Sequence, residues 1–231
     1  MSLPASRPLR IGSLLLLWLS ALSVLSLTAR PAAADEPARL AGGSAPAQSV
    51  QVVGWEQAMA DLKVSAAGVV TDVQLLESTP GFDQRVTDAL KSWTFKPATS
   101  QGTPVPAEVF VTAIYRPPVL FNTPTLGQPP RRLGSPSDAA PYAVTMLTPQ
   151  YPPQAVGDGT VLVEAHVGAD GSVDQASVIG GPSGFDEAAL ASVKQWGFRP
   201  AHAGGTATDA YAYVAFGFRQ PVRSGGPAHG R

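Results

Sequence analysis

The sequence has no cysteine, few charged residues and few histidines, and each shortage excludes a class of function. Without cysteine, the chain of 231 residues has no disulfide, iron–sulfur cluster, thiolate zinc site or cysteine nucleophile. Charged residues are 14%, well below the roughly 25% typical of soluble domains. Because no cluster of lysine or arginine accompanies the formal net charge of -1, we expect no nucleic acid partner.

Motifs for catalysis and for cofactor binding are also missing. The sequence has no G-x-S-x-G elbow, no Walker loop and no dinucleotide fingerprint. The three histidines, His166, His202 and His229, lack the spacing of a metal site. Asp83 and Asp186 each begin an expected helix, where a carboxylate complements the helix dipole. We therefore expect a protein that is not an enzyme and that binds neither a cofactor nor a metal.

The N-terminus has the pattern of an export signal. Arg7 and Arg10 precede a long apolar stretch, and Ala32-Ala33-Ala34 provides the A-x-A pattern that signal peptidase reads. We expect cleavage before Asp35, which would release the rest of the chain into the periplasm. An uncleaved segment would instead tether the protein to the inner membrane, facing the periplasm.

The remainder of the chain contains a tandem repeat. Gly81-Phe82-Asp83 recurs as Gly184-Phe185-Asp186, 103 positions later, and a Lys-x-Trp-x-Phe-x-Pro-Ala pattern at 91–98 recurs at the same offset. Residues 64–115 and 167–218 are identical at 16 of 52 positions. Two copies are too few for a solenoid, so each copy is expected to be a compact module.

Hydrophobic periodicity predicts the same order of elements in both copies. In the second copy, residues 161–167 alternate as a strand, Asp170-Gly171 supplies a tight turn, and residues 173–179 complete a hairpin. An amphipathic helix beginning near Phe185 and a last alternating strand at 210–218 follow. The predicted fold class is α+β: two small two-layer modules, each a three-stranded antiparallel sheet (hairpin, helix, strand) with a helix packed on one face.

Composition and periodicity also predict the domain boundaries. Trp93 and Trp196 fall on the apolar helix faces, so we expect them in the two cores rather than in a ligand groove. The expected segments are a signal peptide or membrane anchor at 1–34, a first module at 48–117, a Pro-rich linker at 118–140, a second module at 141–221 and a flexible tail at 222–231.

The second copy resembles the TonB carboxy-terminal domain. The resemblance rests on an ordered series of motifs: Gln150-Tyr151-Pro152-Pro153, Asp170-Gly171-x-Val173, Phe185-Asp186-x-Ala188-Ala189-Leu190 and Trp196-x-Phe198-x-Pro200-Ala201. The first copy is similar but has Gln48-Ser49 in place of Tyr151-Pro152, so we interpret it as a degenerate member. No histidine precedes His166, and the stretch 35–47 is short, so the resemblance does not extend to the anchor and long spacer of an energy-transducing TonB.

The resemblance implies protein binding in TonB-dependent transport. TonB-like domains project into the periplasm and receive an extended peptide of an outer-membrane transporter by strand addition at a sheet edge. The partner would be an outer-membrane TonB-dependent receptor or another envelope protein. By this analogy residues 211–218 form an open docking edge. The implied peptide-binding residues are Gln150, Tyr151, Tyr211, Tyr213, Val214 and Phe216.

A second interpretation stays open. The chain would then be a structural or scaffolding protein of the cell envelope, whose modules pair with each other or with another chain, as in a homodimer.

Overall fold

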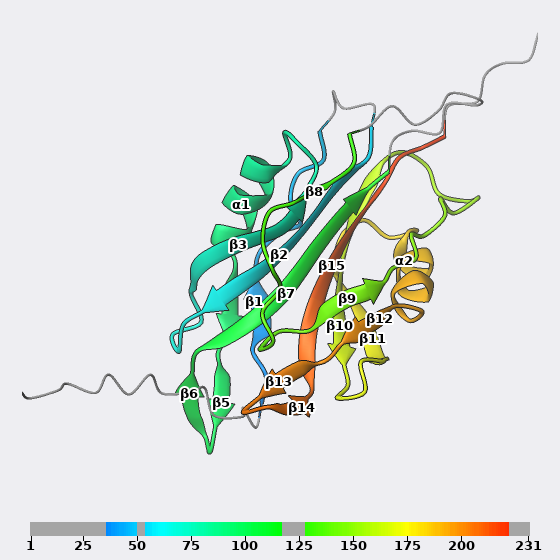
Figure 1. The fold of residues 1–231 in the computed structure, drawn as a ribbon. Helices are drawn as coiled ribbons and strands as arrows, with labels where there is room; N and C mark the ends of the chain where they lie inside the picture. Colours follow the sequence, from blue (N-terminus) through cyan, green and yellow to red (C-terminus); the bar gives the residue numbers. More distant parts are fainter. Residues whose placement is uncertain (1–35, 50–53, 117–127, 222–231) are drawn as a thin grey trace, which may run out of the picture.

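The computed structural model of the chain describes residues 36–49, 54–116 and 128–221, which contain two helices and fifteen strands (Figure 1). The expected signal segment at 1–34 and the tail at 222–231 lie outside the described residues. Within the described residues, no helix is long and apolar enough to cross a membrane.

Both copies contain the expected hairpin, helix and strand, together with shorter elements. The first copy comprises β1 (Arg39–Gly42), β2 (Glu56–Val64), β3 (Val70–Ser78), α1 (Asp83–Lys91), β4 (Thr94–Lys96), β5 (Ala98–Ser100), β6 (Thr103–Val105) and β7 (Ala107–Tyr115). The second comprises β9 (Tyr142–Thr145), β10 (Gly159–Val167), β11 (Val173–Gly180), α2 (Asp186–Val193), β12 (Gly197–Arg199), β13 (Ala201–Ala203), β14 (Thr206–Thr208) and β15 (Ala210–Phe218). Between them lies β8 (Arg131–Arg132).

Two short strands fall outside the expected module boundaries. β1 precedes residue 48 and pairs with β4, as its equivalent β9 pairs with β12. The first module therefore begins earlier than the sequence suggested. β8 lies inside the stretch expected to be a linker, yet it pairs with β3.

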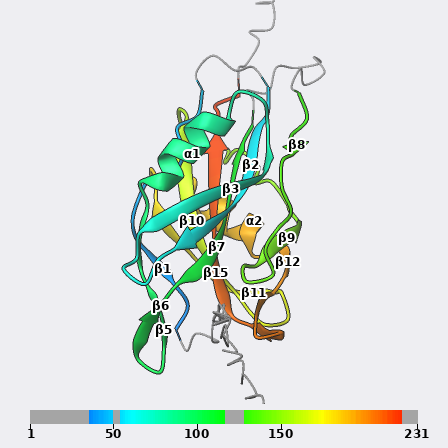
Figure 2. The same ribbon diagram turned by 60° about the vertical axis from the view of Figure 1, so that its left-hand side comes forward.

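The two modules share one sheet, so the prediction of two separate three-stranded sheets is wrong. Seven strands form a mixed sheet in the order β11-β10-β15-β7-β2-β3-β8. Its neighbours are antiparallel except β15 and β7, which run parallel, with Ala212 opposite Phe110 and Gly217 opposite Tyr115. The last strands of the two copies therefore pair with each other inside the sheet (Figures 1 and 2).

The helices cover opposite faces of this sheet (Figures 1 and 2). Side chains of a strand alternate between the two faces, so each face presents one set of residues to one helix. Val111 of β7 belongs to the core that contains Val86 and Leu90 of α1. Its equivalent in β15, Val214, belongs to the core that contains Val193 of α2. Parallel pairing of equivalent strands thus turns the second module over relative to the first.

Each module contributes an aromatic side chain to the other module's core. Phe110 of β7 packs beneath α2, where its ring centroid lies 5.7 Å from that of Tyr142 and 6.3 Å from that of Phe198. Tyr213 of β15, its equivalent, packs beneath α1, with its ring centroid 5.8 Å from that of Trp93. Neither side chain is exposed to solvent. The two cores are therefore interlocked across the sheet.

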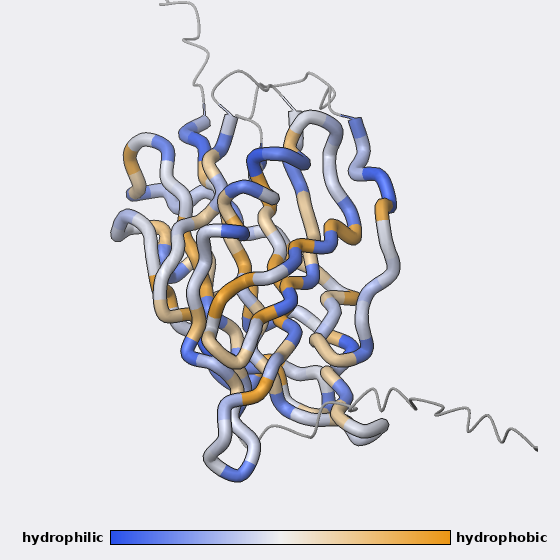
Figure 3. The backbone as a smooth tube through the Cα atoms, turned by 90° about the vertical axis from the view of Figure 1, so that its left-hand side faces the viewer, coloured by the Kyte–Doolittle hydropathy of each residue, from blue (hydrophilic) through white to orange (hydrophobic). Residues whose placement is uncertain are grey.

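The two tryptophans lie in these cores, as predicted. Both are buried, and each indole Nε1 donates a hydrogen bond to a backbone carbonyl: Trp93 to Ser44 at 2.9 Å and Trp196 to Leu147 at 2.8 Å. The two bonds occupy equivalent places in the repeat and hold the segments that follow β1 and β9 against their helices. Many of the hydrophobic stretches run through the body of the molecule, whereas many turns are hydrophilic (Figure 3).

The parallel contact requires a glycine in β15. A Cβ atom built on Gly217 would lie 2.4 Å from Cδ1 of Tyr115, a ring that is fully buried and whose hydroxyl donates to the Pro46 carbonyl. Because this ring has no free space to move into, a methyl group at position 217 would force β7 and β15 apart.

We therefore predict that Gly217→Ala lowers the free energy of unfolding by about 1–3 kcal/mol, as overpacking in a core does. Gly180→Ala is the matched control, because its Cβ would meet only Leu162 Cβ, at an ordinary 3.8 Å. Urea titration followed by tryptophan fluorescence would measure both variants. Equal stability of the two would contradict the tight packing described for the contact between β7 and β15.

Candidate peptide-binding site

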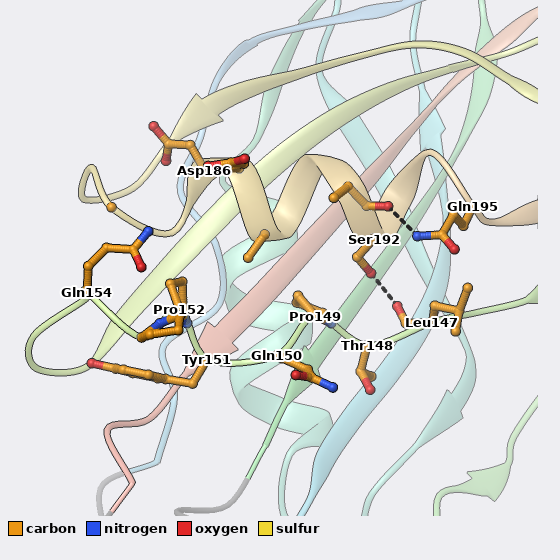
Figure 4. A pocket seen from close by; sticks show the side chains of 15 residues that line it. Leu147, Thr148, Pro149, Gln150, Tyr151, Pro152, Gln154, Asp186, Ser192 and Gln195 are labelled. Atoms are coloured by element: carbon orange, nitrogen blue, oxygen red, sulfur yellow. Dashed lines mark hydrogen bonds between the residues drawn. The ribbon is translucent and has the colours of Figure 1, made fainter.

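The structure divides the six residues predicted to bind peptide into two groups. Gln150 and Tyr151 lie in the extended segment that leads from β9 towards β10, beside α2 (Figure 4). The remaining four lie on β15, which is the third strand of the sheet counted from β11. The two groups therefore do not form one continuous docking edge.

The prediction that residues 211–218 form an open edge is wrong. β15 pairs with β10 on one side and with β7 on the other. The side chains of Tyr213, Val214 and Phe216 are at most 1% exposed, because they pack in the two cores. In this arrangement β7 of the first module occupies the edge at which a peptide was expected.

Tyr211 is the most accessible of the four residues on β15. It is half-buried, its ring centroid lies 5.2 Å from that of His166, and the guanidinium carbon of Arg39 lies 5.3 Å from its centroid. Because Arg39 comes from β1, Tyr211 contributes to the contact between modules rather than to a free surface.

Gln150 and Tyr151 line an open groove of about 670 Å3 between residues 147–154 and one side of α2 (Figure 4). The Tyr151 hydroxyl donates a 2.8 Å hydrogen bond to the Gly157 carbonyl, and its ring packs edge-on to Phe185. Tyr151 is thus held in place by the fold, whereas the side chain of Gln150 is exposed. The groove is lined by polar side chains, prolines and small or apolar residues such as Leu147 and Ala191, and no metal-binding cluster occurs among the described residues.

The two modules differ at this groove because of a substitution in the helix. In the first module, Arg85 of α1 donates to the Ala47 carbonyl and forms an ion pair with buried Glu56. It thereby joins the helix to the preceding segment. The equivalent of Arg85 in α2 is Ala188, whose short side chain lines the groove instead.

The outer edges of the sheet differ as well. In the first module the end of β3, at Glu77 and Ser78, pairs with β8, whereas the equivalent strand of the second module, β11, is the last strand in the sheet order. Edge strands present unpaired backbone groups that accept a further strand. β11 is therefore the edge of the second module at which strand addition needs no rearrangement. The sequence does not reveal this edge, because an alternating pattern identifies a strand but not its position in a sheet.

Two buried carboxylates lie near the contact between the modules, at equivalent positions of the repeat. Glu164 of β10 accepts hydrogen bonds from Nε and Nη2 of Arg39 at 3.0 and 2.7 Å, and the Tyr213 hydroxyl donates to it at 3.2 Å. Asp61 of β2 has no ion pair among the described residues, and accepts one hydrogen bond, from the backbone N–H of Ser137 at 2.8 Å. Glu164 is thus neutralised, whereas Asp61 is not.

The difference perturbs the acidity of Asp61. Burial raises the pKa of its carboxyl to about 6, against the opposing effects of the Ser137 N–H and the Arg199 guanidinium, and nearby Glu108 raises the pKa further. Both carboxylates point into packed structure rather than into the groove, and neither lines it. We therefore assign them structural roles.

The fold is a tandem pair of small α+β modules joined through their last strands, and the second module carries the groove beside α2 and the edge strand β11. The chain matches the family described as Gram-negative bacterial TonB protein C-terminal over residues 57–117 and again over 148–219. The two matches cover more than half of the sequence, and the chain belongs to this family, with two copies of its domain.

A relative of known name is Protein tonB2 of Pseudomonas aeruginosa. The two proteins are 38% identical over 76 residues, which is 31% of this chain and 28% of that protein. The chain therefore matches little more than a quarter of the relative's length.

The raised pKa of Asp61 predicts a specific dependence of stability on pH. Because the folded state holds the proton more tightly than the unfolded state, Asp61 lowers stability as the pH rises from about 4 to about 6, and its penalty is constant above that range. Asp61→Asn should therefore stabilise the protein at pH 7 by roughly 2–3 kcal/mol and have little effect at pH 4. Denaturant titrations at pH 4, 5, 6 and 7 would measure this.

Asp72→Asn provides the control, because the Asp72 side chain is 53% exposed and its pairing with Lys63 is at the surface. Loss of stability in Asp61→Asn at pH 7 would show instead that the ionised carboxylate supports the fold.

Proposed function

We propose that the protein acts in TonB-dependent transport as a TonB-like protein-binding module of the periplasm. In this proposal the second module captures an extended segment of an outer-membrane receptor by strand addition. Membership of the TonB C-terminal family supports the proposal. The name of the Pseudomonas aeruginosa relative agrees with it.

The single structural observation behind the proposed mode of binding is the uncovered edge of β11. Strand addition needs a row of backbone N–H and C=O groups with no neighbouring strand, and within the described residues β11 has β10 on one side only. Gln150 and Tyr151 would contribute through the groove on the other side of α2, where a receptor segment longer than one strand finds polar side chains.

Capture at β15, the edge implied by the resemblance, would require β7 to leave its place. That movement would withdraw Phe110 from one core and separate Tyr213 from its neighbours in the other. Exposing a large buried aromatic side chain typically costs about 3–5 kcal/mol, judged from truncations in protein cores. Binding at β11 carries no such cost, so we favour it over the site first predicted.

The pairing of β7 with β15 favours a second candidate function. The scaffolding interpretation predicts modules that pair with each other, and the parallel contact is a pairing of that kind. A scaffolding protein would use the fused sheet as a rigid unit and would have no specific affinity for transport receptors.

A capture experiment distinguishes the two functions. The immobilised chain would be incubated with an outer-membrane extract, and bound proteins identified by mass spectrometry. The proposed function predicts enrichment of TonB-dependent receptors, and loss of that enrichment when proline replaces Ala176 or Ser177 in the middle of β11. Proline removes a backbone donor, and one of these two adjacent residues directs its N–H towards the open side.

Circular dichroism must first establish that the proline variants are folded. The control variants are Thr71→Ala and Gln74→Ala on β3, the equivalent strand of the first module, which should leave enrichment unchanged if capture occurs at β11. Failure to enrich any TonB-dependent receptor with the unaltered chain would contradict the proposed function and support the scaffolding alternative.

A further inference from the structure

The first module contains an internal example of strand addition. β8 pairs antiparallel with the end of β3, with Arg131 opposite Ser78 and Arg132 opposite Glu77. The backbone N–H groups of Leu133 and Gly134 then both donate to the Leu76 carbonyl, at 2.8 and 3.2 Å. A short extended segment of the chain therefore already occupies this edge (Figure 2).

The equivalent edge in the second module has the same register up to Gly180, beyond which Gly181, the equivalent of Ser78, lies outside β11 with a φ of +128°. The register of β10 with β11 repeats that of β2 with β3, including the irregularity that makes Ile179 the equivalent of Leu76. The added segment, however, is missing beside β11 among the described residues. The second module thus has an edge strand that could accept such a segment, whereas in the first module β8 already pairs with the equivalent strand.

Burial of the equivalent apolar residues reflects this difference. Leu76 is 1% exposed within the core that contains Val193, and a Cβ atom built on Gly134 would lie 3.7 Å from its Cδ2, whereas Ile179 is 41% exposed. An exposed isoleucine on an unpaired edge is a liability that proteins usually avoid or cover. A segment added to β11 in the manner of residues 131–134 would cover Ile179.

A charged contact completes the internal example. Asp83, the first residue of α1, forms an ion pair through its Oδ2 atom with Nη2 of Arg131. Its equivalent Asp186 begins α2 and has no ion pair among the described residues. In both Asp83 and Asp186 the Oδ1 atom is buried without a hydrogen-bond partner. The two carboxylates differ in that Arg131 contacts Oδ2 of Asp83. A neighbouring acid, Glu187, is exposed in the same helical turn.

We propose that β11, Ile179 and Asp186 form a docking site for an extended, arginine-bearing segment of a partner protein. The segment adds antiparallel to β11, its arginine binds the carboxylate of Asp186, and a glycine three residues later fits against Ile179, as in the Arg131-Arg132-Leu133-Gly134 segment on β3. The excess of acidic groups at this end of α2 selects a basic partner. This inference deepens the proposed function, since it names the chemistry of the peptide that the second module captures.

The probe is a labelled synthetic peptide with the sequence of residues 128–137, Gln-Pro-Pro-Arg-Arg-Leu-Gly-Ser-Pro-Ser. Titration with the purified chain, followed by fluorescence anisotropy, should give saturable binding. Asp186→Asn should weaken binding by roughly 3- to 10-fold, the range expected for one partly exposed, charge-assisted contact. Asp83→Asn is the matched control and should not weaken binding, because the peptide does not use the covered edge.

Changes in the peptide separate backbone from side-chain recognition without altering the protein. Replacing its first arginine with alanine should weaken binding to the unaltered chain as much as Asp186→Asn does, with no further loss when the two changes are combined. The leucine of the peptide corresponds to Leu133, whose N–H donates to the Leu76 carbonyl in the first module. Methylating the backbone nitrogen of this leucine should abolish binding. Absence of binding, or binding indifferent to Asp186, would overturn the inference.

Two other occupants of the edge would also overturn it. Residues 222–231 contain Arg223 and Arg231, so binding that appears only after both are changed to alanine would assign β11 to the chain's own tail. A dimer in sedimentation experiments that dissociates in the Asp186→Asn variant would assign the edge to a second copy. If the peptide binds in an Asp186-dependent manner but no receptor is captured, the proposed function alone is refuted. If receptors are captured but the peptide shows no Asp186-dependent binding, this inference alone is refuted.

Discussion

The parallel pairing of β7 with β15 is the constraint on which the rest of the structure depends. It joins the two last strands, and because equivalent strands run in the same direction, it places α1 and α2 on opposite faces of one sheet. Each central strand then has one face in each core and requires apolar side chains on both. Phe110 and Val111 satisfy this requirement in β7, as Tyr213 and Val214 do in β15. The cores consequently cannot form independently of each other.

The same pairing determines where a partner can bind. A peptide that displaced β7 from β15 would have to offset the exposure of Phe110 and Tyr213. If each aromatic contributes about 3–5 kcal/mol, displacement would weaken apparent affinity by at least a hundredfold for each. A peptide that added to β11 would meet no competing strand among the described residues. Closure of the central edges therefore leaves the periphery of the sheet as the place where strand addition costs least.

Local features of the fold were predictable from sequence, whereas contacts between the modules were not. The tight turn at Asp170-Gly171 and the burial of Trp93 and Trp196 follow from short-range patterns, and the structure confirms them. The pairing of β7 with β15 depends on residues about a hundred positions apart, which no periodicity identifies. One signal was present, because residues 109–115 are apolar on both faces, a pattern typical of a strand buried on both sides rather than of an edge. The candidate edge was missed for a related reason: β8 has two arginines after two prolines and no strand pattern of its own, so its pairing with β3 appears only in three dimensions.

The two copies have kept the residues that build the scaffold and diverged at the surfaces that could bind a partner. In the first module, Arg85 bridges the helix to the preceding segment, and residues 131–134 cover the sheet edge. In the second, Ala188 leaves a groove, and in the part of the chain that the structure describes β11 has no neighbour beyond β10. Contacts made within one chain compete with any external partner at a high effective concentration, so the first module is poorly suited to capture one. It instead closes the inner edge of its neighbour, while the groove beside α2 and the outer edge at β11 lie on the second module.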